Sequence, residues 1–159
     1  MGKIVLEQNR LIFQRRDELV VIEAYGRNCL RTRATRNACI SDENWTLLPP
    51  ATEDNCIIEG NEDFATITNG DVKATIEAGF PWYGGIICFY RKDKLILKTK
   101  YEGDYVNKYV HTEGNHYTVK AIFEANPGEH FYGLGQETED AFDRKGSTCN
   151  LVHYNTKST

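Results

Sequence analysis

Long hydrophobic runs are missing from this chain of 159 residues. No stretch approaches the roughly 20 apolar residues that a membrane-spanning helix needs, so we expect no contact with a membrane. The first residues, 1–7, include no apolar segment of the kind that secretion signals carry. We therefore expect a cytoplasmic protein.

Paired cysteines and an excess of positive charge are missing as well. No two of the five cysteines are spaced as CxxC; they are Cys29, Cys39, Cys56, Cys88 and Cys149. An odd number without such spacing favours reduced, independent thiols over a disulfide framework or a zinc site. The formal net charge of −4 repels a phosphate backbone and argues against a nucleic-acid partner. We expect neither a metal nor a cofactor.

Helical periodicity is the third absence, because no such run reaches the length of an ordinary helix of about 12 residues. Short alternating or β-branched runs between turn-forming residues predict strands instead. We expect strands at residues 11–16, 19–25, 30–35, 64–68, 72–76, 85–90, 95–99, 117–124 and 150–154. Many short strands separated by turns predict an all-β domain, an antiparallel β-sandwich or barrel, over residues 1–159.

Turn residues make two of these connections specific. Asn69-Gly70 lies between two strand-like runs and predicts a hairpin with a type I′ turn, in which both central residues take positive φ. Residues 91–94 predict a second hairpin. Residues 42–64 contain two consecutive prolines and many polar residues, so we expect a surface loop, fastened by Trp45 and Leu47 as buried anchors.

Other conspicuous residues favour structural roles over chemistry. The basic cluster of Arg27, Arg31, Arg33 and Arg36 is typical of a solvated sheet face. His111 and His116 flank a turn, and we favour exposed turn residues over a mutarotase-like acid–base site. For His130 and His153 we expect packing or hydrogen-bonding roles. Residues 80–84, with Trp82, favour a turn packed on the core over a sugar-stacking platform.

The strongest motif lies near the C-terminus. Residues 129–136 read Glu-His-Phe-Tyr-Gly-Leu-Gly-Gln, residues 142–146 read Phe-Asp-Arg-Lys-Gly, and residues 154–156 read Tyr-Asn-Thr. In this order they resemble the N-terminal, galactose mutarotase-like domain of glycoside hydrolase family 31, and residues 30–35 resemble an earlier strand of that domain. The first motif is not a dinucleotide-binding fingerprint, because its third glycine is missing and no helix follows.

The resemblance implies a fold and a function. It implies a galactose mutarotase-like supersandwich that is incomplete at its C-terminal end, and a parent enzyme that is a retaining exo-α-glycosidase. Members of the family carry two catalytic aspartates on a following (β/α)8 barrel, which would need about 250 further residues. We therefore expect no catalytic residue in this chain, whose partners would be the missing barrel and an α-linked oligosaccharide.

In the family a loop from the sandwich helps to close the sugar subsite, and residues 136–149 occupy that place here. The resemblance thus nominates Phe142, Asp143, Arg144 and Lys145 as substrate-binding residues, against the alternative of a solvated acidic loop. Rings can cover apolar sugar faces, and charged groups can bind hydroxyls.

Two further expectations concern specificity and assembly. Lys157 follows the Tyr-Asn-Thr stretch where many α-glucosidases of the family have an aspartate, which favours the α-xylosidase type over the α-glucosidase type. An unpaired sheet edge would favour self-association between copies. The alternatives to an accessory domain are a stand-alone carbohydrate-binding module and an aldose mutarotase.

Overall fold

The computed structural model describes residues 2–49, 56–79, 84–100, 106–114, 116–133 and 142–148. The chain divides into two compact units, residues 1–124 and residues 125–159. The described residues contain eleven strands, β1 to β11, all in the first unit. No helix long and apolar enough to cross a membrane occurs within the described ranges.

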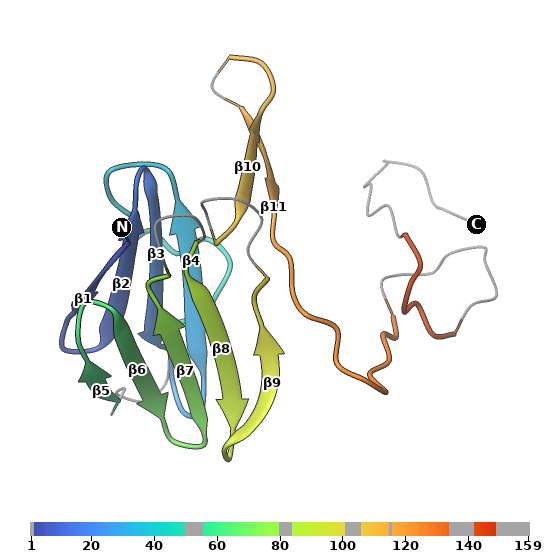
Figure 1. Ribbon diagram of the computed structural model, residues 1–159, viewed down its shortest axis with the longest axis horizontal. Helices are drawn as coiled ribbons and strands as arrows, with labels where there is room; N and C mark the ends of the chain where they lie inside the picture. The colour runs from blue at the N-terminus through green and yellow to red at the C-terminus, as the bar shows by residue number, and fades with distance from the viewer. Residues whose placement is uncertain are drawn as a thin grey trace. The chain divides into compact units, whose positions relative to one another are not determined.

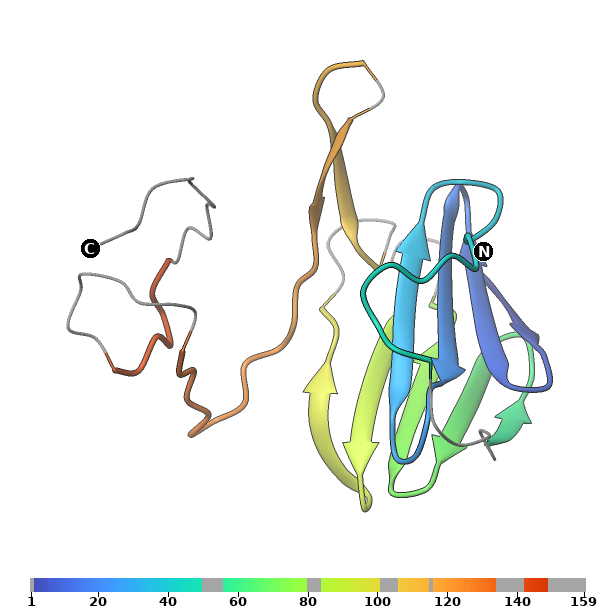
Figure 2. The ribbon, with the colours of Figure 1, turned by 180° about the vertical axis from the view of Figure 1, so that it is seen from behind.

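The first sheet has four antiparallel strands in sequence order. They are β1 (Lys3–Leu6), β2 (Arg10–Arg15), β3 (Glu18–Ala24) and β4 (Leu30–Thr35). In Figure 1 this sheet, in blue and cyan, lies behind the second sheet, and in the reverse view of Figure 2 it lies in front. The strand at residues 30–35 is predicted correctly at both ends.

The second sheet has five antiparallel strands, again in sequence order. They are β5 (Ile57–Gly60), β6 (Phe64–Asn69), β7 (Val72–Glu77), β8 (Ile86–Arg91) and β9 (Lys94–Lys98). The two predicted hairpins are β6–β7 and β8–β9. The short strands β1 and β5 fall where no strand is predicted.

The hydrophobic core fills the space between the two sheets. In the strands that line the core, such as β2 and β6, alternate residues point inward, as the two-residue period of a strand requires. The first sheet contributes Ile4, Leu11, Phe13, Val20 and Ile22 to the buried core. The second sheet contributes Ala65, Ile67, Ala74, Ile76 and Ile87, and Ala78 after β7 and Val106 complete the core. The described residues thus form an antiparallel β-sandwich, and the predicted all-β fold class is confirmed.

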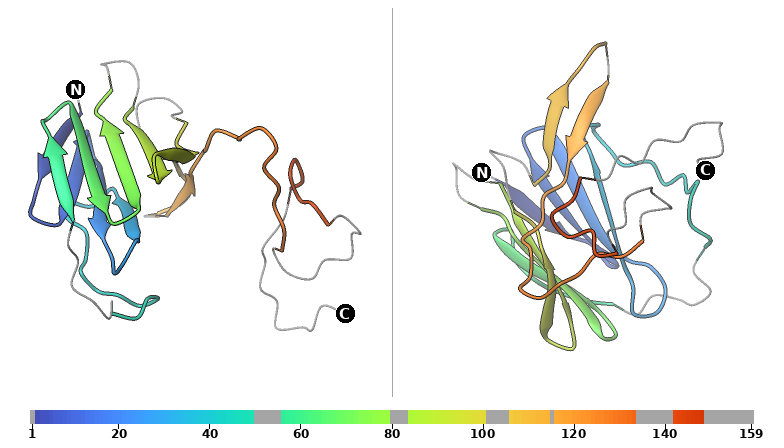
Figure 3. Two further views of the ribbon diagram at one scale, coloured as in Figure 1. Left: turned by 90° about the horizontal axis from the view of Figure 1, so that it is seen from below. Right: turned by 90° about the vertical axis from the view of Figure 1, so that its right-hand side faces the viewer.

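A two-stranded ribbon, β10 (Lys108–His111) and β11 (Tyr117–Lys120), stands apart from both sheets (Figure 3). A predicted strand over residues 117–124 is therefore too long: beyond Lys120 only an isolated bridge joins Phe123 to Thr99. The predicted strand at 150–154 and the turn at Trp82 lie outside the described residues.

A buried carboxylate fixes the start of this ribbon. Glu18 accepts hydrogen bonds from the backbone N–H groups of Val106 (2.9 Å) and Asn107 (3.1 Å) and from the Asn107 side chain (3.0 Å). Burial, and then the nearby Glu18 charge, raise the pKa of Tyr109 to about 12, so this phenol stays protonated in ordinary buffers.

The Asn69-Gly70 turn differs from its prediction. Asn69 pairs with Val72 inside the ladder, so the loop residues are Gly70 and Asp71. Only Gly70 has positive φ (61°), which is the pattern of a type II′ turn and not of type I′. The Asn69 amide instead donates to the carbonyls of Gly26 (2.6 Å) and Cys29 (2.9 Å), and so links the two sheets.

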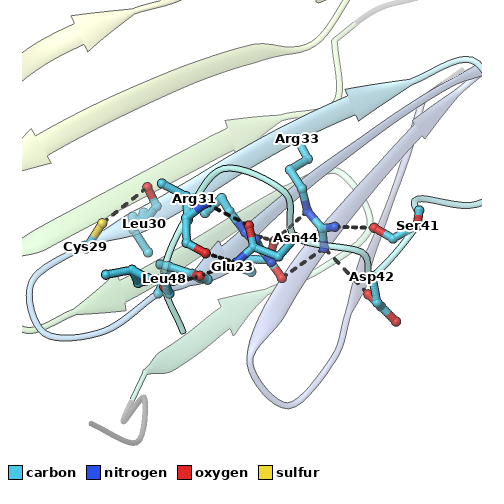
Figure 4. Close-up of polar contacts among 11 residues, drawn as sticks. Glu23, Cys29, Leu30, Arg31, Arg33, Ser41, Asp42, Asn44 and Leu48 are labelled. Atoms are coloured by element: carbon cyan, nitrogen blue, oxygen red, sulfur yellow. Dashed lines mark hydrogen bonds and ion pairs between the residues drawn. The ribbon is translucent and has the colours of Figure 1, made fainter. Parts of the chain in front are cut away.

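The arginines of β4 also differ from their prediction as a solvated face. The Nε atoms of Arg31 and Arg33 each lie 2.8 Å from the carboxylate of Glu23 on β3, and all three side chains are largely buried (Figure 4). Glu23 lies opposite Arg31 in the β3–β4 register, which brings the charges together. The sequence spacing of the arginines alone carried no sign of this partner.

Trp45 and Leu47 are not buried anchors. The Trp45 side chain is 86% exposed and Leu47 is exposed as well. Polar contacts fasten this segment in their place: Arg33 donates to the Ser41 carbonyl (2.6 Å), and Tyr25 donates to the Leu48 carbonyl (2.7 Å).

Candidate functional site

The described part of the second unit is built around the carboxylate of Asp143. Oδ1 accepts hydrogen bonds from the backbone N–H groups of Phe131 (3.1 Å) and Lys145 (3.0 Å), and Oδ2 lies 2.7 Å from Nδ1 of His130. We call these four residues the Asp143 clasp. The clasp joins the Phe-Tyr-Gly motif to the Phe-Asp-Arg-Lys-Gly motif.

Local geometry explains why an aspartate occupies this position. A side-chain oxygen that accepts the N–H two residues later forms an Asx turn, which Asp and Asn make readily. Gly146 follows with φ of 81°, a conformation that favours glycine. The N–H of Arg144 donates back to the Phe131 carbonyl (2.8 Å), so the two stretches are bound through both backbone and side chain.

The clasp keeps Asp143 ionised. The hydrogen bond with His130, followed by those from the N–H groups of Lys145 and Phe131, lowers the pKa of Asp143 to about 2. Hydrogen bonds to the charged form stabilise it, which explains this direction. At neutral pH the carboxylate is an acceptor and cannot donate a proton, so it is unsuited to serve as a general acid.

The four predicted substrate-binding residues lie together in one turn but differ in the exposure and hydrogen bonding of their side chains. Phe142 is 83% exposed, whereas Arg144 is only 8% exposed. Lys145 donates from Nζ to the Asn126 carbonyl (2.9 Å), and Asp143 accepts the three clasp contacts. Phe142 is therefore the member whose side chain is most available, and sugar binding by all four remains a prediction.

A row of rings continues from Phe142. Its ring centroid lies 4.9 Å from that of Tyr132, and the Tyr132 ring stacks on His130 with centroids 6.0 Å apart. Sequence reasoning gave His130 a packing or hydrogen-bonding role, which the structure shows, but did not single out Tyr132. The only sequence signal for Tyr132 is its place in the Phe-Tyr-Gly motif, since nothing in the spacing pairs it with Phe142.

The turn histidines show contacts that suit structural roles. Nε2 of His111 lies 2.7 Å from the Gly114 carbonyl, and its ring packs edge-on against Tyr117 with centroids 5.3 Å apart. His111 and His116 are both exposed. Within the described ranges, no group of three or more His, Cys, Asp or Glu side chains could hold a metal ion.

Comparison with known proteins decides the family. Residues 19–158 match the model of the glycosyl hydrolase 31 N-terminal galactose mutarotase-like domain. The chain belongs to this family. The match covers β3 and β4 of the first sheet, the whole second sheet and the region of the Asp143 clasp, and the predicted relationship to family 31 N-terminal domains is confirmed.

Two relatives place this family 31 domain within longer proteins. An uncharacterized family 31 glucosidase, ORF2, of Pseudescherichia vulneris is 25% identical over 183 residues, covering 100% of this chain and 33% of the relative. A crystal structure of a family 31 α-xylosidase from a soil metagenome, complexed with xylose, superposes with a TM-score of 0.80 at 26% identity. That match covers 94% of this chain and 24% of the α-xylosidase. This chain therefore spans about a quarter of the α-xylosidase and a third of ORF2.

Proposed function

We propose that this domain is a non-catalytic part of a retaining exo-α-glycosidase and that its Phe142 turn contributes to the sugar subsite of a catalytic barrel. The observation that carries the proposal is the exposed Phe142 ring, set against Tyr132 on a turn that the Asp143 clasp fixes. A fixed, exposed ring can cover the apolar face of a pyranose at little entropic cost.

The division of labour within the turn follows from the contacts. Asp143 and Arg144 shape the turn, because the Asp143 carboxylate holds His130 and two N–H groups and Arg144 is buried. Phe142 supplies the contact surface. Lys145 Nζ donates to the Asn126 carbonyl and lies 3.9 Å from the Glu129 carboxylate, so its ammonium group is partly engaged within the second unit.

We further propose an α-xyloside as the substrate of the complete enzyme. By the family resemblance, Lys157 stands where many α-glucosidases carry an aspartate, and the soil-metagenome relative is an α-xylosidase complexed with xylose. An α-glucoside is the second candidate, favoured by the description of the P. vulneris relative as a glucosidase.

Assays on the chain itself separate the accessory role from its alternatives. The chain should release no p-nitrophenol from p-nitrophenyl α-D-xyloside or α-D-glucoside and should not accelerate mutarotation of fresh α-glucose in a polarimeter. Hydrolysis by the chain unaided would overturn the proposal. Accelerated mutarotation would identify a mutarotase, and saturable submillimolar binding of xylose- or glucose-containing oligosaccharides would identify a carbohydrate-binding module.

A chimaera tests the subsite. This chain would replace the aligned quarter of the soil-metagenome α-xylosidase, and the hydrolysis of p-nitrophenyl α-D-xyloside would be measured. Phe142→Ala should lower kcat/KM by about tenfold, the loss expected when one stacking ring is removed. The matched control, Phe64→Ala, removes a half-exposed ring from β6 and should leave kcat/KM unchanged. Equal effects of both changes would contradict a subsite role for Phe142.

A further inference from the structure

Three exposed rings form a row in the second unit. Phe142 is 83% exposed, Tyr132 is 56% exposed, and the side chain of His130 is 55% exposed. The ring centroids of Phe142 and Tyr132 lie 4.9 Å apart, and those of Tyr132 and His130 lie 6.0 Å apart with planes inclined by 20°. Because each of these residues is more than half exposed, packing against a core contributes little to the orientation of its ring, and contacts within the row matter most.

The row is fixed at its His130 end by the carboxylate of Asp143. Nδ1 of His130 lies 2.7 Å from Oδ2 of Asp143, while Oδ1 is engaged by two backbone N–H groups. An ionised carboxylate only accepts hydrogen bonds, so Nδ1 of His130 is the donor. Hydrogen bonds to an ionised group are about twice as strong as neutral ones, which makes this the firmest side-chain contact of the row.

The backbone on both sides of His130 is held by bonds that do not involve its ring. On one side, the Glu129 N–H donates to the Asn126 carbonyl (3.3 Å). On the other side, the Arg144 N–H donates to the Phe131 carbonyl (2.8 Å). The turn should therefore keep its backbone when the His130 side chain is replaced, and the ring has a task other than building the turn.

The contacts of the row lead from the carboxylate to the most exposed ring. Asp143 binds the imidazole of His130, the imidazole stacks on the phenol of Tyr132, and the phenol packs against Phe142. Phe142 precedes Asp143 in the chain, but the backbone alone leaves an exposed phenylalanine free to choose among its rotamers. Contact with Tyr132 restricts that choice, and Tyr132 is in turn restricted by His130.

We propose that His130 is a positioning residue, which holds Tyr132 in place and through it orients the Phe142 ring toward the sugar. This role rests on the proposed function, because the ring that His130 orients is the one proposed to contact the substrate. His130 itself neither touches the sugar nor transfers a proton. A histidine suits the task because one edge of its ring donates to the carboxylate while its face stacks on the phenol.

Two substitutions separate the two contacts of His130. His130→Asn keeps an amide donor close to the place of Nδ1 but has no ring, whereas His130→Phe keeps a ring but has no donor. Both should leave the Phe131 and Lys145 amides protected from hydrogen exchange, because those amides bond to Oδ1 of Asp143. Loss of protection at both amides in His130→Asn would make His130 a builder of the turn and would overturn the proposal.

Nuclear Overhauser effects between the Tyr132 and Phe142 rings test the positioning in the chain itself. The cross-peak should be strong in the wild type, weaker in His130→Phe and absent in His130→Asn, which has nothing to stack on Tyr132. His116→Asn, which replaces an exposed histidine of the first unit, is the matched control and should change nothing. An undiminished cross-peak in His130→Asn would overturn the proposal.

The chimaera with the soil-metagenome α-xylosidase tests whether His130 acts through Phe142. His130→Asn should lower kcat/KM by about three- to fivefold, a smaller loss than that of Phe142→Ala, because the Phe142 ring is misplaced but still present. Once Phe142 is replaced by alanine, His130→Asn should cause no further loss, since the effects of residues that act through one contact do not add. His116→Asn again serves as the control.

The double variant separates failure of the positioning role from failure of the proposed function. Losses that multiply would show that His130 acts independently of Phe142 and would overturn the positioning role. An unchanged kcat/KM in His130→Asn, with Phe142→Ala still impaired, would do the same and leave the proposed function standing. If Phe142→Ala has no effect, the proposed function fails, and the cross-peak between the rings alone decides whether His130 orients Phe142.

Discussion

The β-sandwich and the Asp143 clasp are held by different forces. The sandwich places apolar side chains of both sheets between regular ladders of backbone hydrogen bonds, with Phe13 and Ile67 fully buried. The clasp has little buried apolar surface and depends on one exposed carboxylate that binds two N–H groups and a histidine. The comparison teaches that this family 31 domain combines a scaffold held by apolar packing with a turn whose shape depends on charge.

Removal of a core ring should have the largest effect. Phe13→Ala deletes a fully buried side chain of β2, and large-to-small changes of this kind cost about 3–5 kcal/mol. Urea unfolding followed by circular dichroism should show that loss for the sandwich. The same change at exposed Phe131 in the second unit should shift the sandwich transition by less than about 0.5 kcal/mol. Similar shifts would show that the two regions unfold as one.

Two glycine substitutions compare a packed turn with an open one. An added Cβ at Gly70 (φ 61°) would lie 2.0 Å from Oδ1 of Asn28, whereas at Gly114 (φ 58°), in the same unit, it would meet no atom within 4 Å. Gly70→Ala should destabilise the sandwich by about 2 kcal/mol or more, because steric overlap adds to the left-handed strain of roughly 1–2 kcal/mol. Gly114→Ala carries only the strain. Thermal melting checks the pair, and equal melting temperatures would remove the Asn28 contact from the explanation.

Loss of the Asp143 charge should change the clasp and leave the sandwich intact. Asp143→Asn retains one acceptor oxygen but weakens the hydrogen bonds from Phe131 and Lys145 and the contact with His130. Amide hydrogen exchange at Phe131 and Lys145 should become faster, with an unchanged melting temperature. Asp93→Asn, at an exposed turn of the sandwich, is the control and should alter neither. Unchanged exchange at both amides in Asp143→Asn would contradict the clasp.

Acid should have the smallest and most local effect. The folded-state pKa of Asp143 is lowered from 3.8 to about 2, so its contribution is complete above about pH 4 and is lost as pH falls through about 2. Exchange protection of the Phe131 and Lys145 amides should disappear over that interval, a step that the Asp143→Asn variant lacks. If protection of these amides were already lost near pH 6, a group other than Asp143 would control it.

The sequence predicted the strands whose pattern is local. The alternation in residues 30–35 and the runs on either side of the β6–β7 and β8–β9 turns fix strands from near neighbours alone. The short strands β1, β5 and β10 were not predicted, because their pairing with β2, β6 and β11 supplies what their own sequences do not. The turn type was also predicted wrongly. Lys92 and Asp93, with φ of 47° and 62°, adopt the type I′ pattern that was expected at Asn69-Gly70.

Side-chain environment was harder to predict than backbone. Trp45 and Leu47 were expected inside on hydrophobicity alone, yet the hydrogen bonds of Asn44 and Tyr25 hold their segment on the surface. Arg31 and Arg33 were expected in solvent, but the register places Glu23 opposite Arg31, where its carboxylate pairs with both arginines. At the candidate site the motif located the turn, whereas the clasp from Asp143 to His130 joins positions that only the fold brings together.

The order of strands within each sheet has a consequence for folding. Every strand from β1 to β4, and every strand from β5 to β9, pairs with its neighbour in the chain. Closing such short loops costs little conformational entropy, so each sheet can assemble as an independent meander from successive hairpins. The docking of the two meanders is then the step that joins distant parts of the sequence, and the bonds from Asn69 to the β3–β4 turn form only when it is complete.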